Sequence, residues 1–348
     1  METIVATAVG GGWLLLFGWT GFLAFGAFLL AGYATVRWHV ATKGTSSSAT
    51  VAALLMAFGL FFVKIIAPLV AGSFANPGGF ELALPLGLSY LAIRIVDLLI
   101  SLRARAIAPP SFLEYASFML YPAALAAGPI MTYGDFRKSR IESWSIVDWA
   151  AGTARWSIGV GKKLIADAYV APALAASYSE YLLTPEQATF KLVAPMLLLN
   201  FAFIYLDFSA FADLALGSGR AAGRSLPENF NWPLFRSSLR GYWQNWHMTL
   251  SNWVMRRVYF PTFIESRSIA LSATSSMVLI GLWHFPSTGW LLWALHHALG
   301  LTVNSWFTER WSGREQKRPA GLLHRSISLA WLVAGWCMAM SWVALGYV

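Results

Sequence analysis

The sequence predicts an all-α membrane protein that crosses the bilayer several times. Of its 348 residues, 57% are hydrophobic and 12% are charged, whereas about a quarter of a typical soluble domain is charged. The mean hydropathy is +0.56. Several apolar runs also reach the roughly 20 residues that a helix needs to cross the hydrocarbon core. Together these three observations exclude an ordinary soluble globular protein.

The predicted spans follow one another along the whole chain. The clearest lie near 13–34, 49–72, 80–101, 187–206, 267–285, 288–307 and 326–347. Less regular apolar runs near 111–131 and 147–180 favour broken or re-entrant helices, so we expect roughly eight to eleven helices in total. Neither a Ser/Gly-rich linker nor an internal repeat divides the chain. We therefore expect a single membrane-embedded domain over 1–348.

Basic residues in the short loops predict the orientation of the chain. Arg37 and Lys43 follow the first span, and Arg103 and Arg105 follow the third. By the positive-inside bias, the first and third spans end in the cytoplasm and the N-terminus starts outside. The net charge of +9 is thus a topology signal and does not indicate nucleic-acid binding. The first run lacks a preceding basic stretch and a cleavage site, so we expect a retained helix and not a signal peptide.

One segment breaks this alternation. Arg137, Lys138 and Arg140 follow the apolar run near 111–131 and would lie outside if that run crossed the bilayer completely. Gly128 and Pro129 interrupt the run, and a non-helical backbone at membrane depth is tolerated where protein buries it. We therefore predict a re-entrant segment there.

Two carboxylates close the predicted span near 187–206. Asp207 and Asp213 stand in an otherwise apolar stretch, so they need charged partners or a polar cavity. Charge pairs that fix a helix end are the favoured interpretation, and a direct catalytic role is the alternative. The basic residues nearest in sequence, and hence the expected partners, are Arg220, Arg224, Arg236 and Arg240.

Two histidines lie in tryptophan-rich stretches. From Leu234 to Phe263 apolar residues recur at helical spacing between arginines, which predicts an amphipathic helix in the membrane interface. His247 borders its apolar stripe and is expected to face inward. His284 ends a later apolar run, and Pro286 predicts that the helix breaks just after it. Imidazole exchanges protons near neutral pH, so the pair suggests acid–base chemistry at a membrane.

The remaining histidines and the single cysteine give weaker signals. His296 and His297 lie in the next predicted span, where a packing or hydrogen-bonding role is favoured. Cys337 is the only cysteine, so an internal disulfide and a thiolate zinc cluster are excluded. No His-Glu-x-x-His, phosphate loop or dinucleotide fingerprint occurs, so neither a metal nor a bound nucleotide cofactor is predicted.

Six stretches occur in a fixed order over residues 85–301. They are Pro85-Leu-Gly-Leu-Ser89, Ala127-Gly-Pro-Ile130, Tyr205-Leu-Asp-Phe-Ser209 with Ala212-Asp213, Pro227-Glu-Asn-Phe-Asn231, Trp243 through Trp253, and Gly281-Leu-Trp-His284. In this combination the chain resembles the membrane-bound O-acyltransferase family, and most closely its bacterial branch that modifies polysaccharides, as in alginate O-acetylation and teichoic-acid D-alanylation.

The resemblance implies a funnel-like helical fold around a catalytic tunnel, in the inner (cytoplasmic) membrane. The near-invariant histidine of the family maps onto His284, and the upstream active-site position maps onto His247. The glycine that usually follows the first of these is Phe285 here, and the chain is shorter than many relatives. Candidate residues that bind substrate or line the tunnel are Trp243, Trp246, Asn245, Trp283, Asp207, Ser209, Asp213, Asn229 and Asn231.

The implied reaction moves a small acyl group, acetyl by resemblance, from a cytoplasmic thioester to a hydroxyl of an envelope glycan or an exported carrier protein. The donor would be acetyl-CoA or an acyl-carrier thioester, with no bound cofactor. His284 would act as general base, and His247 would orient the carbonyl or the acceptor and stabilise the oxyanion. Direct transfer is favoured because no activated serine or cysteine is evident, but an acyl-histidine, or an acyl-serine at Ser209 or Ser251, stays open.

Other functions remain as alternatives. Transfer of D-alanyl, or of an acyl group to a lipid, would use the same site, and a carrier protein could dock on the loop 137–140. A transporter or channel could use Arg94, Asp97 and Asp207, although the chain lacks the inverted repeats common in transporters. Arg94 and Asp97 are three residues apart on one helical face, and a structural pair is favoured for them. A non-catalytic scaffold is the third class.

Overall fold

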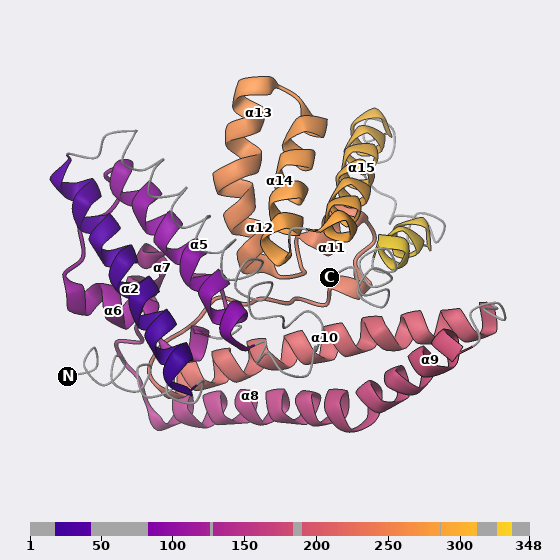
Figure 1. The fold of residues 1–348 in the computed structure, drawn as a ribbon, viewed down its shortest axis with the longest axis horizontal. Coiled ribbons are helices and arrows are strands. Elements are labelled where there is room, and N and C mark those ends of the chain that lie inside the picture. The colour runs from indigo at the N-terminus through magenta and orange to yellow at the C-terminus, as the bar shows by residue number, and fades with distance from the viewer. Residues whose placement is uncertain are drawn as a thin grey trace. The chain divides into compact units, whose positions relative to one another are not determined.

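A computed structural model describes residues 18–42, 83–125, 128–183, 190–285, 287–311 and 326–335, and in these ranges every regular element is a helix (Figure 1). The chain divides into two compact units. The first comprises Met1–Trp156 and Asp213–Pro227, and the second comprises Ser157–Ala212 and Glu228–Val348. The predicted all-α class is thus confirmed for the described residues.

The first unit is built from two long helices and several short ones. They are α2 (Gly18–Ala41), α5 (Ala83–Arg103), α6 (Phe112–Met119), η4 (Pro122–Ala124), α7 (Tyr133–Lys138), the start of α8 (Ile146–Ile165) and, from Asp213 on, the end of α10 (Phe190–Ala221). Capping boxes begin two of the short helices: Ser111 with Glu114 at α6, and Thr132 with Asp135 at α7. These caps satisfy backbone N–H groups that the first turn of a helix leaves without partners.

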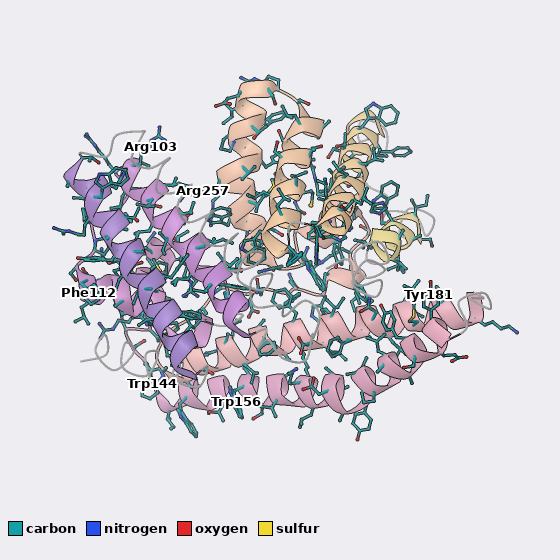
Figure 2. The ribbon with its side chains drawn as sticks, viewed as in Figure 1. Arg103, Phe112, Trp144, Trp156, Tyr181 and Arg257 are labelled. Carbon is teal, nitrogen blue, oxygen red and sulfur yellow. The ribbon has the colours of Figure 1, made fainter. Side chains whose placement is uncertain are left out.

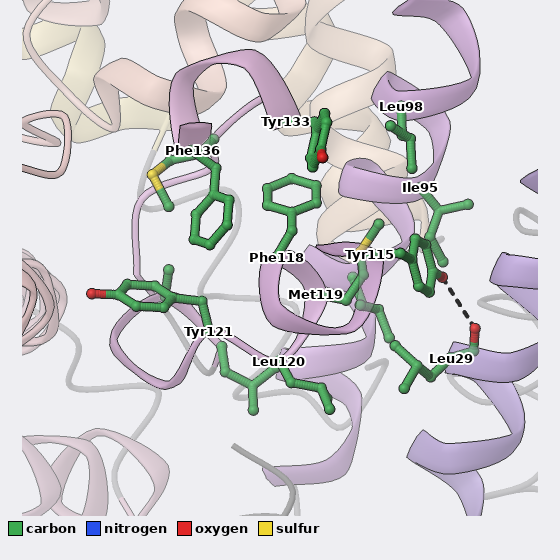
Figure 3. Packing of buried hydrophobic residues seen from close by; sticks show 14 of the residues in the cluster. Leu29, Ile95, Leu98, Tyr115, Phe118, Met119, Leu120, Tyr121, Tyr133 and Phe136 are labelled. Carbon is green, nitrogen blue, oxygen red and sulfur yellow. Dashed lines mark hydrogen bonds between the residues drawn. The ribbon is translucent and has the colours of Figure 1, made fainter. Parts of the chain in front are cut away.

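Aromatic and aliphatic side chains fill the core of this unit (Figure 3). Phe118 of α6 packs edge-on against Tyr133 of α7, with ring centroids 5.6 Å apart. The Tyr115 hydroxyl donates to the carbonyl of Leu29, 3.1 Å away, and so ties α6 to α2. Arg94 of α5 is also buried, and it donates to the carbonyls of Phe118, Met119 and Ala124. Arg94 therefore caps the end of α6, which is a structural role.

The irregular run near 111–131 is broken as predicted. After α6 the chain makes the single turn η4, and residues 128–132 are not helical. A Cβ on Gly128 would clash with the Ala124 backbone, so this close approach needs glycine. Whether the segment re-enters the membrane stays a prediction.

The second unit contains the remaining helices. The end of α8 continues through a π-helical turn, η5 (Ala166–Val170), into α9 (Ala171–Leu183). The others are α10 up to Ala212, η7 (Pro233–Phe235), α11 (Leu239–Trp243), α12 (Met248–Val254), the π-helical η8 (Met255–Tyr259), α13 (Phe260–Ser266), α14 (Ile269–His284), α15 (Thr288–Trp311) and the helical residues 326–335. α14 approaches α15 closely at Gly281, where a Cβ would lie 2.7 Å from the Trp290 carbonyl oxygen.

Most predicted spans coincide with observed helices. α2, α5, α10, α14 and α15 match the runs near 13–34, 80–101, 187–206, 267–285 and 288–307, while the run near 49–72 lies outside the described residues. Among the described helices, Val193–Ala221 is long and apolar enough to cross a membrane, and Ile269–His284 and Ser326–Gly335 are shorter apolar helices. Trp144 and Trp156, labelled in Figure 2, are 46% and 45% exposed.

Candidate active site

His247 lies at a break between two short helices. α11 ends at Trp243, α12 begins at Met248, and His247 adopts a left-handed backbone conformation with φ 42° and ψ 53°. The prediction of one amphipathic helix over 234–263 is therefore wrong. The cause is a distant segment, because the Met248 N–H donates to the Asn229 carbonyl and the Asn231 N–H donates to the Asn245 carbonyl. Both flanks keep helical spacing, so periodicity did not reveal the break.

Asn229 fixes the tautomer of His247. Its side-chain oxygen accepts hydrogen bonds from the N–H of Thr249 at 3.3 Å and from the Thr249 hydroxyl at 2.8 Å, and it lies 3.1 Å from His247 Nδ1. A backbone N–H can only donate, so this atom is the amide oxygen and not the amide nitrogen. An oxygen can only accept, so Nδ1 carries the proton of the neutral ring, and Nε2 is an acceptor.

The surroundings of His247 keep it neutral. The residue is 3% exposed, and its ring packs edge-on against Phe208 of α10, with centroids 4.7 Å apart. Burial, with a smaller contribution from the charge of His284, lowers the pKa of His247 to about 3. The inward orientation predicted from the sequence is confirmed.

His284 differs from His247 in exposure and in its neighbours. It is the last residue of α14, and Phe285 has an extended conformation, so the helix ends just after the histidine as predicted. The residue is exposed, and its ring stacks on Trp290, with centroids 4.6 Å apart. Trp283 contacts both histidine rings, at 4.9 Å from His284 and 6.4 Å from His247. The structure therefore brings the two histidines together.

Further aromatic residues pack near this pair, among them Trp293, whose ring centroid lies 6.3 Å from that of His284. Trp246 stacks on Tyr242 at 5.5 Å and meets Phe230 edge-on at 5.1 Å. Trp243 meets Trp293 of α15 edge-on at 5.7 Å. Of the tryptophans that the sequence singled out, Trp283 contacts both histidine rings, while Trp243 and Trp246 contact other aromatic residues. Trp290 and Phe208, which contact His284 and His247, were missed. Both missed residues stand close to recognised motifs, Phe208 between Asp207 and Ser209 and Trp290 six residues after His284.

Four other candidates have side chains occupied locally or turned outward. The Asn245 amide donates to the Gly241 carbonyl at 2.7 Å and supports the turn before His247. The hydroxyls of Ser209 and Ser251 donate to carbonyls of Leu206 and Trp246, respectively. Asn231 is exposed and contributes its backbone to the same turn.

The carboxylates pair with residues that the sequence did not suggest. In the second unit, Lys163 Nζ lies 2.6 Å from Asp207 and 2.8 Å from Asp167. In the first unit, Arg155 Nε lies 2.6 Å from Asp213. The expected partners act elsewhere: Arg220 pairs with Asp148, Arg224 donates to the Phe136 carbonyl, Arg236 to the Asn231 carbonyl and Arg240 to Ser305. The partners of both aspartates come from α8, far away in sequence, and proximity along the chain was therefore a poor guide.

The part of the chain that the structure describes contains no cluster of metal-ligating side chains. No group of three or more His, Cys, Asp or Glu side chains there could hold a metal ion. The chemistry that the site offers is that of one exposed and one buried neutral imidazole among aromatic residues.

Comparison with known proteins agrees with these features. The model of the membrane-bound O-acyltransferase family matches residues 6–319. The chain is 29% identical over 234 residues to the probable alginate O-acetylase of Pseudomonas aeruginosa, a match that covers 64% of the chain and 43% of that relative. It is 28% identical over 244 residues to the peptidoglycan O-acetyltransferase of Helicobacter pylori, covering 67% and 43%. It is 25% identical over 309 residues to the teichoic acid D-alanyltransferase of Bacillus subtilis, covering 84% and 75%. The match thus spans less than half of the first two relatives and most of the third.

Proposed function

The chain belongs to the membrane-bound O-acyltransferase family, and we propose that it transfers a small acyl group, acetyl in the first instance, from a thioester to a hydroxyl of a cell-envelope glycan or an exported carrier protein. The observation that carries this proposal is the histidine pair. An exposed imidazole, which a substrate can reach, lies beside a buried imidazole whose tautomer Asn229 fixes.

In the proposed reaction His284 is the general base. Its neutral ring takes the proton of the acceptor hydroxyl as that oxygen forms a bond to the thioester carbonyl carbon. The C–S bond then breaks, and the imidazolium returns the proton to the leaving thiolate. The products are an ester and a free thiol. Positioned acid–base help of this kind contributes about 10² to 10⁴ in rate.

His247 serves as the positioning partner. Because its Nδ1 proton is directed at Asn229, the neutral ring has only an acceptor at Nε2. It therefore fits a role in accepting a hydrogen bond, from an acceptor hydroxyl or from the N–H of His284. It does not fit the oxyanion-stabilising role that the sequence also suggested, since that role needs a donor.

We place this site in a tunnel across the inner membrane of a multi-pass protein. Family membership and the apolar helix Val193–Ala221 support a membrane setting. The aromatic residues near the histidines would keep water away from the thioester. The favoured donor is acetyl-CoA, and transfer is direct, since the hydroxyls of Ser209 and Ser251 donate to carbonyls of their own segments.

Mass spectrometry of envelope polymers and lipids tests this proposal. Cells that carry the intact gene, lack it, or carry His284→Ala would be compared, with the amount of membrane-inserted protein matched by immunoblot. We expect one specific ester to disappear in both altered strains, and its identity would name the acceptor. An ester pattern that is unchanged without the gene contradicts the proposal.

D-alanyl transfer is the second candidate. It is favoured by the match to the Bacillus subtilis relative, which covers 84% of the chain and 75% of that protein. Treating the same envelope material with mild base separates acetyl from D-alanyl transfer, because it releases acetate from an acetyl ester and D-alanine from an alanyl ester. Release of D-alanine would also make a carrier-protein thioester the donor to test first.

A further inference from the structure

His297 of α15 is a buried polar residue that the proposed reaction does not use. It is 0% exposed, and neither ring nitrogen has a hydrogen-bond partner among the residues that the structure describes. A neutral imidazole carries one donor and one acceptor. Native proteins pair nearly all such buried groups, because leaving them unpaired destabilises the fold. An unpaired histidine in the interior therefore needs an explanation.

A second buried polar group, the indole N–H of Trp243, lies next to His297. The indole Nε1–H of Trp243 is buried and has no acceptor within the described ranges of the chain. The two rings meet edge-on, with centroids 5.2 Å apart and an interplanar angle of 84°. Two neighbouring polar groups thus offer an N–H donor and an imidazole that can both donate and accept.

The neighbouring His296 shows what a structural histidine looks like in this helix. Its Nε2 lies 2.9 Å from the Trp331 carbonyl, and its ring stacks on the Trp331 indole at 4.4 Å. The Trp331 Nε1–H in turn donates to the His296 carbonyl at 3.3 Å. His296 therefore fastens the helical segment 326–335 to α15, and it uses its hydrogen-bonding capacity within the protein.

His297 adjoins the candidate active site. Trp293 meets His297 at 4.8 Å and His284 at 6.3 Å, so a single indole separates the third histidine from the proposed base. Trp243 ends α11 and begins the turn that holds His247. Trp243 is 9% exposed and Trp293 is 1% exposed, so both indoles are buried beside His297.

We propose that His297 and Trp243 form a hydrogen-bonding subsite that holds a polar group of a substrate during acyl transfer. The group must both accept and donate, as does a hydroxyl of the acceptor or an amide on the arm of the thioester donor. This inference rests on the proposed function. It explains why two buried polar groups next to the active site have no partner among the described residues, since binding satisfies them.

The two adjacent histidines provide a matched test. His297→Phe keeps an aromatic ring against Trp243 and Trp293 but removes both nitrogens, while His296→Phe removes the bond to Trp331. For His297→Phe we expect an unchanged or higher Tm and a kcat/KM about tenfold lower, the effect of one lost hydrogen bond. For His296→Phe we expect a lower Tm and a kcat/KM within about twofold of the wild type.

The assay uses purified protein, acetyl-CoA and envelope glycan fragments from the producing organism. A raised KM for acetyl-CoA assigns the subsite to the donor amides, and a raised KM for the glycan assigns it to the acceptor hydroxyls. His297→Asn, which keeps a donor and an acceptor, should recover part of the loss. If His297→Phe does not fold, Trp243→Phe tests the same KM effect. A lower Tm with unchanged kcat/KM in His297→Phe, or an unchanged KM in Trp243→Phe, would overturn the subsite.

Failure of the proposed function can be distinguished from failure of the subsite. If the wild type transfers no acyl group, or if His284→Ala transfers at the normal rate, the proposed reaction is wrong. The subsite alone is wrong if the wild type is active, His284→Ala is inactive and His297→Phe retains full kcat/KM for both substrates.

Discussion

Polar side chains are enclosed in two different ways in this molecule. Where α8 meets α10, Asp207 and Asp213 pair with Lys163 and Arg155, so each carboxylate has a cation within 2.6 Å. Around the histidines the neighbours are aromatic rings and the amide of Asn229. In the first arrangement the charges are paired within the protein, and the pairs stabilise helix packing. The second keeps His247 neutral and leaves the proton chemistry of the pair to a substrate.

The largest effect should come from the histidines acting as a unit. We expect His284→Ala and His247→Ala each to lower kcat/KM about 10²- to 10⁴-fold, and the double variant to lose little more than the worse single one. Non-additivity is expected because a positioning partner has nothing to position once the base is gone. Steady-state transfer by the three purified variants measures it, and fully multiplicative losses would mean that the histidines act independently.

The ion pairs should affect stability and not chemistry. Asp213 has a side chain 6% exposed, so Asp213→Asn removes a buried charge that contacts Arg155 Nε, at a cost of about 1–3 kcal/mol in the free energy of unfolding. Because Arg155 is 38% exposed, water replaces part of the lost contact, which keeps the cost in that range. Denaturant unfolding in detergent measures the cost.

Asp148→Asn is the matched control, since its partner Arg220 is 51% exposed and a smaller loss of stability is expected. Both aspartate variants should keep kcat/KM within about twofold of the wild type. If Asp213→Asn loses more acyl transfer than folded protein, this carboxylate has a role in the active site and not only in stability.

The smallest effect concerns pH. The pKa of His247 is lowered to about 3 in the folded protein, against about 6.5 in an unfolded chain. Between these values the unfolded state binds more protons, so this contribution to stability is fully present above about pH 6.5 and is lost as the pH falls. We expect Tm to drop between pH 7 and pH 5, and to drop less in His247→Asn. Above pH 5 the lowered pKa values of Asp148 and Glu114 keep both carboxylates ionised, so they do not contribute to the slope. Equal slopes would show that His247 is not buried as a neutral group.

The features that sequence predicted well depend on local rules. Run length placed α10, α14 and α15, and Pro286 predicted the end of α14 at His284. The motifs also named His247, His284 and Trp283, whose rings the structure places near one another. The features that it missed depend on contacts between distant segments. The break at His247 is produced by hydrogen bonds to residues 229–231, which helical periodicity does not register. The partners of Asp207 and Asp213 lie 44 and 58 residues away on α8. Asn229 was recognised as part of a motif, but its role in fixing the tautomer depends on atom positions.

The claim that the histidine region performs the chemistry is tested most directly by turnover of radiolabelled acetyl-CoA with purified protein in detergent. The wild type, His284→Ala and Asp213→Asn would be compared at equal amounts of folded protein, with the envelope glycan fragments as acceptor. We predict labelled ester from the wild type and from Asp213→Asn, and a loss of about 10²-fold or more in His284→Ala with an unchanged Tm, because the His284 side chain is exposed. Normal turnover by folded His284→Ala, or no transfer by the wild type, would contradict it.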